Sequence, residues 1–371
     1  MLKLKVISFI IIICLSFKSS AQVKNTKLKL FGDIRNRIEN DWDSQKQDGT
    51  MRKDRSRLRL RFRFGFEYNY NSNLQLGGRI RTGNPLGTQS PHTDYGNELI
   101  PKSLVLDKAY VKVKWHKGYF WAGKNSYPFW KQNEMFWDDD ATPEGMAVSH
   151  TLYACNKNSI KLIGGYFLLD NSSSNSFNDK AKFWQTQAVF NFYLNNFNLQ
   201  TAIGYLSFKE NNSQPDLRLL DLNYHLVQTG TNISFPFIRG KNIKLGIDIS
   251  YNLFDYKNSI YNKNQKTGYV GSIKYGNLNS SGNFLIGYYY AHIEKYAVVP
   301  GYAQDDWVRW GSSTVTRSSN FQGHEFRIAY AFAKSHNIVI RLYLVNGIMP
   351  EKNQVQLESG KRLRIDWNLG F

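Results

Sequence analysis

Arginine stands at every second position along one short stretch of the chain. The five residues are Arg55, Arg57, Arg59, Arg61 and Arg63. An extended strand places alternate side chains on the same face, so these five guanidinium groups would share one face of a sheet. A guanidinium stays charged at any physiological pH, and its planar fork binds carboxylate or phosphate oxygens in pairs. The stretch therefore predicts a strand with one anion-attracting face.

Three further arginine pairs have the same spacing: Arg35 and Arg37, Arg79 and Arg81, and Arg362 and Arg364. If the last strand closes onto the first, all of these arginines fall on one wall of a barrel. In one interpretation the wall filters anions. In the other the arginines only brace the barrel by pairing with wall carboxylates, which are Asp33, Glu39, Glu67 and Asp366. The arginines outnumber these partners, which favours the filter because their mutual repulsion would otherwise be unanswered.

An acidic and aromatic segment, residues 127–145, is a candidate counterpart of this wall. Its carboxylates are Glu134, Asp138, Asp139, Asp140 and Glu144. If the segment folds inward, we expect it to narrow the lumen and to face five of the arginines, because opposed walls of charge filter solutes. These five are Arg57, Arg59, Arg61, Arg79 and Arg81. Alternatively, the segment is an outward loop whose aspartates are solvated or bind calcium. Adjacent aspartates point in different directions, so we expect neither a metal nor a cofactor.

Catalytic motifs find little support in the sequence. The histidines are scattered and form no metal-binding spacing such as His-Glu-x-x-His; they are His92, His116, His150, His225, His292, His324 and His336. There is no Gly-x-Ser-x-Gly elbow and no phosphate loop. We therefore expect that the protein is not an enzyme. A barrel enzyme stays the lesser alternative, because outer-membrane proteases and phospholipases share that fold.

Alternating segments of about ten residues would position these side chains, since a tilted strand needs about that length to cross a bilayer. The sixteen predicted strands are 28–38, 55–70, 74–82, 104–115, 119–126, 146–155, 159–169, 182–193, 197–208, 225–235, 242–254, 266–276, 283–296, 321–332, 337–347 and 361–371. The arginines lie opposite apolar residues on these strands. A charged group facing lipid costs roughly several kcal/mol, so we expect the arginines in the lumen.

The predicted connectors alternate between short and long. The short ones are 71–73, 116–118, 156–158, 194–196, 277–281 and 333–336. The long ones are 40–54, 83–103, 127–145, 170–181, 209–224, 255–265, 297–320 and 348–360. A transmembrane barrel with short periplasmic turns and long outer loops has this alternation, and both of its ends are then periplasmic.

The two ends of the sequence fit the same architecture. Residues 1–21 combine lysines, an apolar stretch and small residues before Gln22, which predicts a secretory signal followed by one barrel domain, residues 22–371. The last strand alternates charged and apolar residues and ends at Phe371, which we expect to act as an assembly signal. Cys14 leaves with the signal, so only Cys155 remains and no internal disulfide is expected.

The composition is that of a polar but aromatic chain. Mean hydropathy is −0.48 and aromatic residues make up 15%, as expected for strands that meet lipid on one face and water on the other. The net charge of +19 falls to +16 when the three lysines of the signal are removed. Such basicity fits an anionic solute or surface, and export argues against nucleic acid.

Several motifs in the first part of the chain resemble the putative porin family of Gram-negative outer membranes. They are Gly32-Asp-Ile-Arg35 with Arg37 and Glu39, the run Arg55–Arg61, Gly78–Pro85, Leu106–Tyr110, Ala122–Lys124, Pro128–Trp130 and Asp140–Gly145. The specific likeness covers about residues 30–150. It implies an outer-membrane porin of the general or anion-preferring kind.

The sequence thus predicts an all-β, antiparallel up-and-down barrel in the outer membrane, exported through the periplasm. We expect passive diffusion of small hydrophilic, mainly anionic, solutes. Expected partners are outer-membrane lipid and lipopolysaccharide, the barrel-assembly machinery, these solutes, and further copies of the chain in a homotrimer or an outer-membrane complex. The alternative is a barrel subunit that scaffolds other proteins, with Tyr302, Trp307 and Trp310 either forming a docking patch or packing their loop against the barrel mouth.

Overall fold

The computed structural model describes residues 27–96, 99–169, 181–209, 223–238, 241–256, 264–311, 316–350 and 355–371. The predicted signal peptide, residues 1–21, lies outside this part of the chain and stays a prediction. Among the described residues, no helix is long and apolar enough to cross a bilayer.

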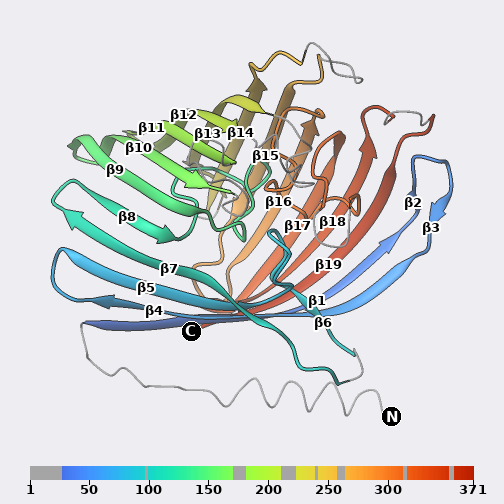
Figure 1. Cartoon of the computed structure of the whole chain (residues 1–371), viewed down its shortest axis with the longest axis horizontal. Helices are drawn as coiled ribbons and strands as arrows, with labels where there is room; N and C mark the ends of the chain where they lie inside the picture. Colours follow the sequence, from blue (N-terminus) through green and yellow to red (C-terminus); the bar gives the residue numbers. More distant parts are fainter. Residues whose placement is uncertain are drawn as a thin grey trace.

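Sixteen antiparallel strands form a closed barrel (Figure 1), which confirms the predicted fold class. The strands are β1 (Leu28–Trp42), β4 (Arg55–Asn69), β5 (Leu74–Thr82), β7 (Leu104–Trp115), β8 (Gly118–Lys124), β9 (Glu144–Cys155), β10 (Asn158–Leu168), β11 (Lys182–Leu194), β12 (Phe197–Lys209), β13 (Tyr224–Pro236), β14 (Asn242–Asn252), β15 (Thr267–Gly276), β16 (Phe284–Ile293), β17 (Phe321–Ala333), β18 (His336–Gly347) and β19 (Ser359–Gly370). Three two-residue strands lie in the loops: β2 (Ser44–Gln45), β3 (Met51–Arg52) and β6 (Thr93–Asp94).

The strand bounds differ from the predicted ones by a few residues. The largest change at the start of the chain is β1, which continues to Trp42 instead of ending at residue 38. A second change concerns Glu144, which was assigned to the acidic loop but is the first residue of β9. Both changes arise because the pairing of neighbouring strands, rather than local alternation, decides where a strand ends.

Closure joins β19 to β1, the last strand to the first. The backbone of Phe371 continues this ladder beyond β19, since its N–H donates to the Gly32 carbonyl and its carbonyl accepts from the Gly32 N–H, both at 3.0 Å. The aromatic ring lies against Gly32, where an added Cβ would be 2.5 Å from the ring. Only a residue without a side chain fits at Gly32 without a shift.

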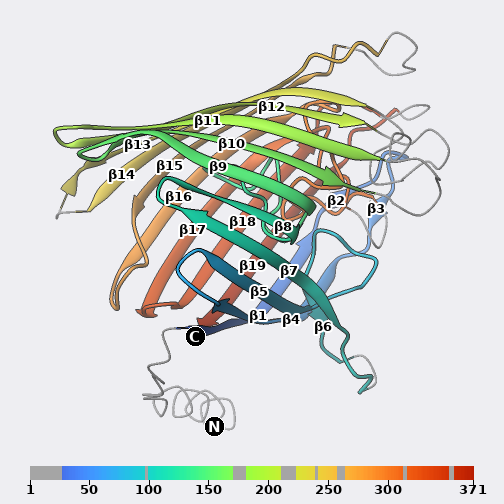
Figure 2. The same cartoon turned by 60° about the vertical axis from the view of Figure 1, so that its left-hand side comes forward.

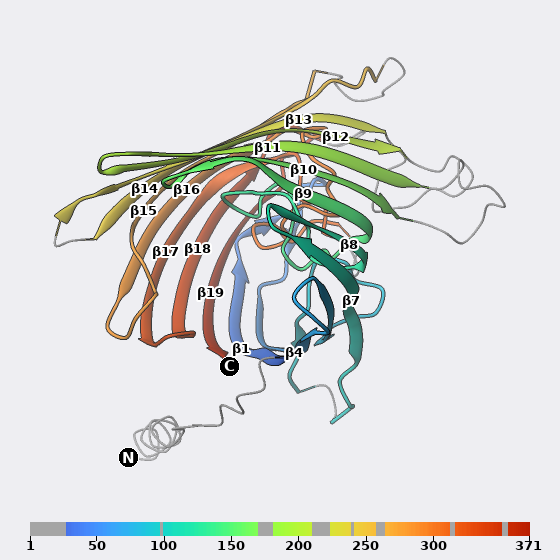
Figure 3. The ribbon, with the colours of Figure 1, turned by 90° about the vertical axis from the view of Figure 1, so that its left-hand side faces the viewer.

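One end of the barrel carries the short turns, the start of β1 and the end of β19 (Figure 3). The opposite end carries the long connections, so the predicted alternation of short and long connectors is confirmed. Exposed aromatic side chains gather beside the short turns: Tyr70, Trp115, Tyr153, Tyr193, Phe197, Phe237, Phe332 and Phe371. This is the aromatic girdle that anchors a barrel at a membrane interface.

Two long loops enter the ring of strands and pack on its inner face (Figure 2). The 125–143 loop follows β8, and the 294–320 loop, which the structure describes over residues 294–311 and 316–320, follows β16. One apolar cluster joins Phe129 and Trp137 of the first loop to Tyr302 of the second and to inner-facing rings of β10, β11 and β12. The other joins Met135 to Trp307, Trp310 and inner-facing residues of β16, β17 and β18. Apolar burial therefore fixes both loops inside the barrel.

Candidate functional site

The arginine wall occupies the inner face of β1, β4, β5 and β19. On β4, Leu58 on the opposite face is 57% exposed while Arg59 is 8% exposed. The antiparallel register places carboxylates between arginines: Glu39 of β1 lies opposite Arg57 of β4 and Arg364 of β19. Because opposite charges directly across a ladder attract, this register stabilises the seam that closes the barrel.

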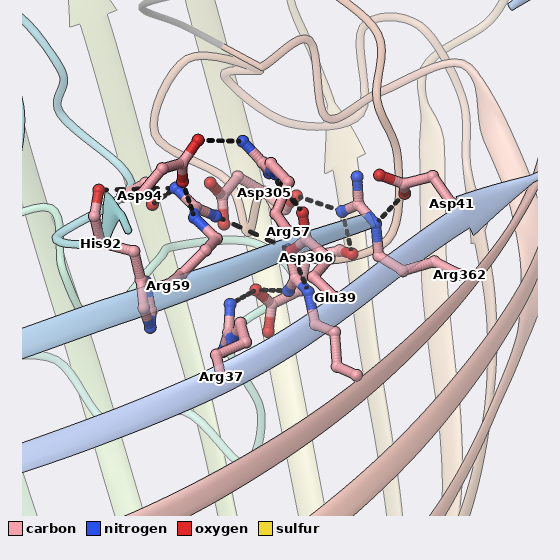
Figure 4. A network of polar contacts seen from close by, with 12 residues as sticks. Arg37, Glu39, Asp41, Arg57, Arg59, His92, Asp94, Asp305, Asp306 and Arg362 are labelled. Carbon is pink, nitrogen blue, oxygen red and sulfur yellow. Dashed lines mark hydrogen bonds and ion pairs between the residues drawn. The ribbon is translucent and has the colours of Figure 1, made fainter. Parts of the chain in front are cut away.

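Glu39 is the centre of the largest cluster on the wall (Figure 4). Its Oε2 accepts a hydrogen bond from Arg364 Nε at 2.7 Å. Its Oε1 accepts from Arg57 and lies 3.5 Å from Arg55 Nη2, while Arg59 Nη1 is 3.7 Å from Oε2. The carboxylate is fully buried, so four arginines compensate for the loss of its hydration.

Two other wall carboxylates repeat this pattern. Asp366 of β19 accepts hydrogen bonds from Arg37 Nε at 2.6 Å and from Arg341 Nη1 at 2.8 Å. Asp33 of β1 accepts from Arg61 Nη2 and from Arg63 Nε, both at 2.7 Å. These were among the wall partners expected from the sequence. Most of the wall arginines therefore brace the barrel, whatever else they do.

Glu67, the fourth expected partner, forms no ion pair with a described arginine. Its carboxylate lies 3.5 Å from the Tyr110 hydroxyl, which donates to it. Its sequence position gave the right face of the sheet but not the distance to the arginines. A phenol hydroxyl is a weaker partner for a carboxylate than a guanidinium.

Asp107 of β7 is a partner that the sequence did not indicate. It pairs with Arg79 Nε and lies 3.3 Å from Arg81 Nε. The inward positions Tyr110 and Lys112 would place Asp107 on the outer face by simple alternation. A bulge opposite Arg79 and Ile80 brings it inside instead, because the extra residue of a bulge inverts the alternation of the strand.

The 125–143 loop crosses the inner face of β11. Gln187 of β11 accepts a hydrogen bond from the Trp130 N–H at 2.7 Å and donates to the Trp130 carbonyl at 2.8 Å. The Tyr127 hydroxyl donates to Gln185 on the same strand. These contacts hold the loop against the wall opposite the arginines. They also give the Trp130 backbone groups the hydrogen-bond partners that buried backbone groups need.

The loop carboxylates expected to face the arginines have different surroundings. Asp140 alone pairs with a wall arginine, at 3.0 Å from Arg63 Nη1, and Arg63 is not one of the five arginines that were expected to face this loop. Asp139 pairs with Lys131 at 2.6 Å, and Glu144 pairs with Lys124 at 2.9 Å. Asp138 is buried and accepts a hydrogen bond from the Asp140 N–H at 2.7 Å. The structure therefore brings one of the five acidic residues to the arginine wall.

Burial and neighbouring charges shift the pKa values of these loop carboxylates in opposite directions. Burial would raise the pKa of Asp140, but Arg61 and Arg63 outweigh it and hold the value below its ordinary range. Burial and the adjacent Asp140 raise the pKa of Asp138 well above its ordinary value. Burial and Asp139 raise the pKa of Glu134 to about 7. Two of these groups are thus protonated under conditions in which a solvated carboxylate is ionised.

Glu134 borders a cavity of about 380 Å³ that is lined by residues of β14, β15, β16 and β17 rather than by the strands of the arginine wall. The other charged residues that line it are Lys244, Lys274, Glu325 and Arg327. None of the expected arginines lies there. Glu134 therefore contributes to a different part of the lumen from Asp140.

The 294–320 loop supplies the carboxylate that sequence reasoning missed, Asp306. It pairs with Arg364 and lies 3.7 Å from Arg37 Nη1 and 3.9 Å from Arg341 Nη1. Burial would raise its pKa, but Arg364 and the other arginines hold it well below the ordinary value. The sequence offered only the pair Asp305-Asp306 as a signal, and the loop drew attention for its aromatic residues instead.

Those aromatic residues pack the loop inside the barrel. Tyr302, Trp307 and Trp310 are all buried. Tyr302 stacks on Trp137 of the other inward loop, with 5.4 Å between ring centroids, and Trp307 packs on Tyr343 of β18 at 5.6 Å. The sequence left two roles open for these residues, an exposed docking patch or packing of their loop. In the structure they pack the loop.

The wall keeps a positive excess after pairing. In the described part of the chain, eleven arginines lie on it, and ten of them form ion pairs with eight carboxylates, while Arg35 forms none. The arginines are Arg35, Arg37, Arg55, Arg57, Arg59, Arg61, Arg63, Arg79, Arg81, Arg362 and Arg364. A cavity of about 1100 Å³ opens beside Arg55, Arg57, Arg59 and Lys102, with Asp94 and Asp305 as its acidic residues.

The histidines do not form a reactive cluster in the described residues. His225 contacts the Tyr205 hydroxyl, His324 contacts the Tyr288 hydroxyl, and His292 Nε2 lies 3.8 Å from Glu294. No group of three or more metal-binding side chains is placed to hold an ion in this part of the chain.

A closed barrel of sixteen strands with two inward loops and a charged lumen is the architecture of an outer-membrane porin. A family model described as putative porin matches residues 47–242, which is more than half of the chain. The chain therefore belongs to the putative porin family, as its motifs predicted. Membership in this family supports a location in the outer membrane.

Solved structures with this fold include OprB of Pseudomonas putida at high pH, with 11% identity, a TM-score of 0.58 and coverage of 93% of this chain and 94% of that one. OmpF of Salmonella typhi in complex with daunomycin has 12% identity, a TM-score of 0.53 and coverage of 92% and 97%. OmpT of Vibrio cholerae in its trimer form has 11% identity, a TM-score of 0.51 and coverage of 93% and 99%. No curated protein sequence matches the chain. At these identities the likeness shows the fold alone.

Proposed function

We propose that the protein is a porin through which small hydrophilic solutes diffuse passively, with a preference for anions. The observation that carries the proposal is the positive excess of the arginine wall, eleven guanidinium groups against eight paired carboxylates in the described residues. Fixed charge in a narrow aqueous passage raises the local concentration of ions of opposite sign. An anion entering the lumen therefore meets a favourable potential.

The large cavity supports the same direction of selectivity. Among the side chains that line it, Arg55, Arg57 and Lys102 are basic, and Asp94 is the acidic residue nearest to them. The Arg55 side chain is 31% exposed and that of Arg57 is 22% exposed, so both keep contact with water while pairing with the wall. We infer that this cavity is the outer vestibule of the passage.

The two inward loops would narrow the passage and set its size limit. Asp140 and Asp306 carry negative charge from these loops to the arginine wall. This arrangement differs from the one expected, in which the 127–145 segment alone opposed the arginines. In the proposal the 294–320 loop shares that role, because its Asp306 reaches two wall arginines, Arg37 and Arg364, and also Arg341 of β18.

Recording single channels in planar bilayers tests this function. The wild type should conduct, and Arg55→Gln should shift the reversal potential toward cations. Asp94→Asn, a matched change of opposite sign in the same vestibule, should shift it toward anions. Equal shifts in one direction, or a cation-selective wild type, would contradict the proposed selectivity. Arg55 is one of the four arginines around Glu39, so gel mobility without heating is measured first to establish that both variants are folded.

A scaffold barrel is the second candidate, and the packing inside the lumen favours it. Tyr302, Trp307 and Trp310 lie buried between the two inward loops and the wall, as they would in a plugged barrel. A scaffold would show no conductance in bilayers. Such a result in a correctly folded protein would replace the porin proposal with this one.

The remaining expectations belong to the same proposal. We infer export through the periplasm with cleavage after residue 21, insertion by the barrel-assembly machinery, and contact with outer-membrane lipid and lipopolysaccharide. A homotrimer is proposed as the assembly. Analytical ultracentrifugation of the detergent-purified protein would distinguish a trimer from a monomer.

A further inference from the structure

One level of the arginine wall has no carboxylate, and it divides the wall into two braced zones. Between β1 and β4 the register pairs Asp33 with Arg63, then Arg35 with Arg61. On the other side of β1, Arg35 lies opposite Asn368 of β19. Like charges directly across a ladder repel. Arg61 is balanced by Asp33 of the neighbouring level, whereas Arg35 forms no ion pair in the described residues.

Some guanidinium N–H groups of Arg35 and Arg61 have no hydrogen-bond acceptor among the described residues. Arg35 donates through Nε to Asn368 Oδ1 at 2.6 Å, which leaves both Nη atoms without a partner. Arg61 uses Nε and Nη2 for Asp33, at 3.0 and 2.7 Å, and keeps Nη1. Asp140, the loop carboxylate whose charge reaches this level, is bonded to Arg63.

His92 of the 83–103 loop adds a third donor to the same region. Its side chain is more than nine-tenths buried, and Nε2 has no hydrogen-bond partner in the described residues. Burial and the charges of Arg37, Arg59, Arg35 and Arg61 hold the pKa of His92 well below its ordinary value, so the imidazole is neutral. A neutral imidazole with its proton on Nε2 donates one hydrogen bond. Figure 4 shows His92 beside Arg37 and Arg59 of the wall.

We propose that Arg35, Arg61 and His92 form a discrete binding site for a small tetrahedral oxyanion inside the lumen. The inference deepens the proposed function, on which it rests, by naming a ligand class and a place. The three donor groups come from β1, β4 and the 83–103 loop. A tetrahedral oxyanion has three or four oxygens to offer to separate donors, whereas a carboxylate has two oxygens in one plane.

Binding would also reduce the repulsion between Arg35 and Arg61, which lie opposite each other in the ladder. An oxyanion between Arg35 and Arg61 would screen their repulsion and accept a hydrogen bond from the buried Nε2 of His92. A buried polar atom without a partner is otherwise destabilising. The site therefore combines an orphan donor with Arg35, which forms no ion pair in the described residues, and one ligand would serve both.

Isothermal titration calorimetry with inorganic phosphate tests the site on the folded full-length barrel in detergent. We expect saturable binding of one phosphate by the wild type. Arg35→Gln should weaken it about tenfold or more, because a charge-assisted bond is lost. His92→Phe keeps the volume and the net charge of the protein and should weaken binding about threefold to tenfold. Lys157→Gln removes one positive charge in the short turn between β9 and β10, where Lys157 lies over the Tyr193 ring, and should leave the affinity within about twofold.

Equal weakening in all three variants, or no phosphate binding by the wild type, would overturn the site. Acetate that binds as tightly as phosphate would overturn the preference for a tetrahedral ligand. The calorimetric result does not depend on conduction. Phosphate binding by a barrel that fails to conduct would retain the site and remove the porin function. An anion-selective channel that binds no phosphate would retain the porin function and remove the site.

Discussion

Arg364 on the last strand donates a hydrogen bond to Glu39 on the first, with 2.7 Å between Nε and Oε2, and both side chains are buried. The pair crosses the seam where the barrel closes. Arg57, on the other side of β1, binds the second oxygen of the same carboxylate. The closure of the barrel and the charge of its lumen therefore depend on the same residue.

Glu39→Gln should destabilise the barrel strongly. The substitution leaves Arg57, Arg59 and Arg364 without their shared counter-charge, and removing one partner of a buried ion pair costs about 3–5 kcal/mol. Urea unfolding of the detergent-folded protein measures the change. Glu67→Gln is the matched control, because Glu67 forms no ion pair with a described arginine and accepts a hydrogen bond from the Tyr110 hydroxyl. It should change the free energy of unfolding by less than about 1 kcal/mol. Similar changes in the free energy of unfolding for the two substitutions would show that Glu39 at the seam stabilises the barrel no more than Glu67 does.

Gly32→Ala should impair assembly. The new methyl group would lie 2.5 Å from the Phe371 ring and 2.7 Å from the Arg63 carbonyl oxygen, so the backbone of the closing pair must shift. The folded fraction, measured by gel mobility without heating, should fall. Gly271→Ala on β15 has no atom within 4 Å of its new Cβ and should fold normally. Deletion of Phe371 should resemble Gly32→Ala, and normal folding of both would refute the role of this contact.

Asp306→Asn should strengthen the preference for anions and weaken the barrel. It removes a negative charge that lies beside Arg37, Arg341 and Arg364, so the lumen becomes more positive. Reversal potential reports the selectivity, and urea unfolding reports the stability. Lys131→Gln, which releases Asp139 of the other inward loop, should shift the reversal potential the opposite way. A shift toward cations in Asp306→Asn is incompatible with a path along the arginine wall.

The pH dependence of the barrel's stability and of its ion selectivity should follow the ionisation of Glu134. Its pKa is raised to about 7, so the folded protein binds more protons than the unfolded chain between the ordinary glutamate pKa and that value, and stability falls as pH rises through this range. Ionisation above it also adds a negative charge to the lumen. Asp139, Asp140, Asp306 and Lys131 influence the group from the loops, and Lys244, Lys274, Glu325 and Arg327 from the cavity wall.

Between about pH 6 and pH 8 the anion preference should therefore decline in the wild type. Glu134→Gln should flatten this profile and leave the selectivity near its low-pH value. A profile that persists unchanged in Glu134→Gln would assign the titration to another group.

Local alternation made much of the fold predictable. Arg55–Arg63 repeats with period two, and this pattern depends only on neighbouring residues, so the strand and its inner face follow directly. Phe371 and the alternation of β19 identified the closing strand for the same reason. The short turns were evident because they separate strands of fixed length.

The partners of the arginines depend on information that one strand does not carry. A register shift of one residue between β1 and β4 would turn Glu39 away from Arg57, and the sequence does not state the register. Asp107 faces inward because of a bulge. Asp306 reaches the wall because Trp307 is buried beside it. Long-range packing decides all three, which is why the acidic residues of 127–145 were expected where Asp306 lies.

The zero-current potential of the wild type in a potassium chloride gradient tests the central claim most directly. Charge screening acts over about 10 Å at 0.1 M salt and about 3 Å at 1 M, so a lumen selected by fixed arginines should prefer chloride at low salt and lose much of that preference at high salt. A potential of the sign for potassium preference at low salt, or a folded barrel that carries no current, would contradict an anion-selective porin.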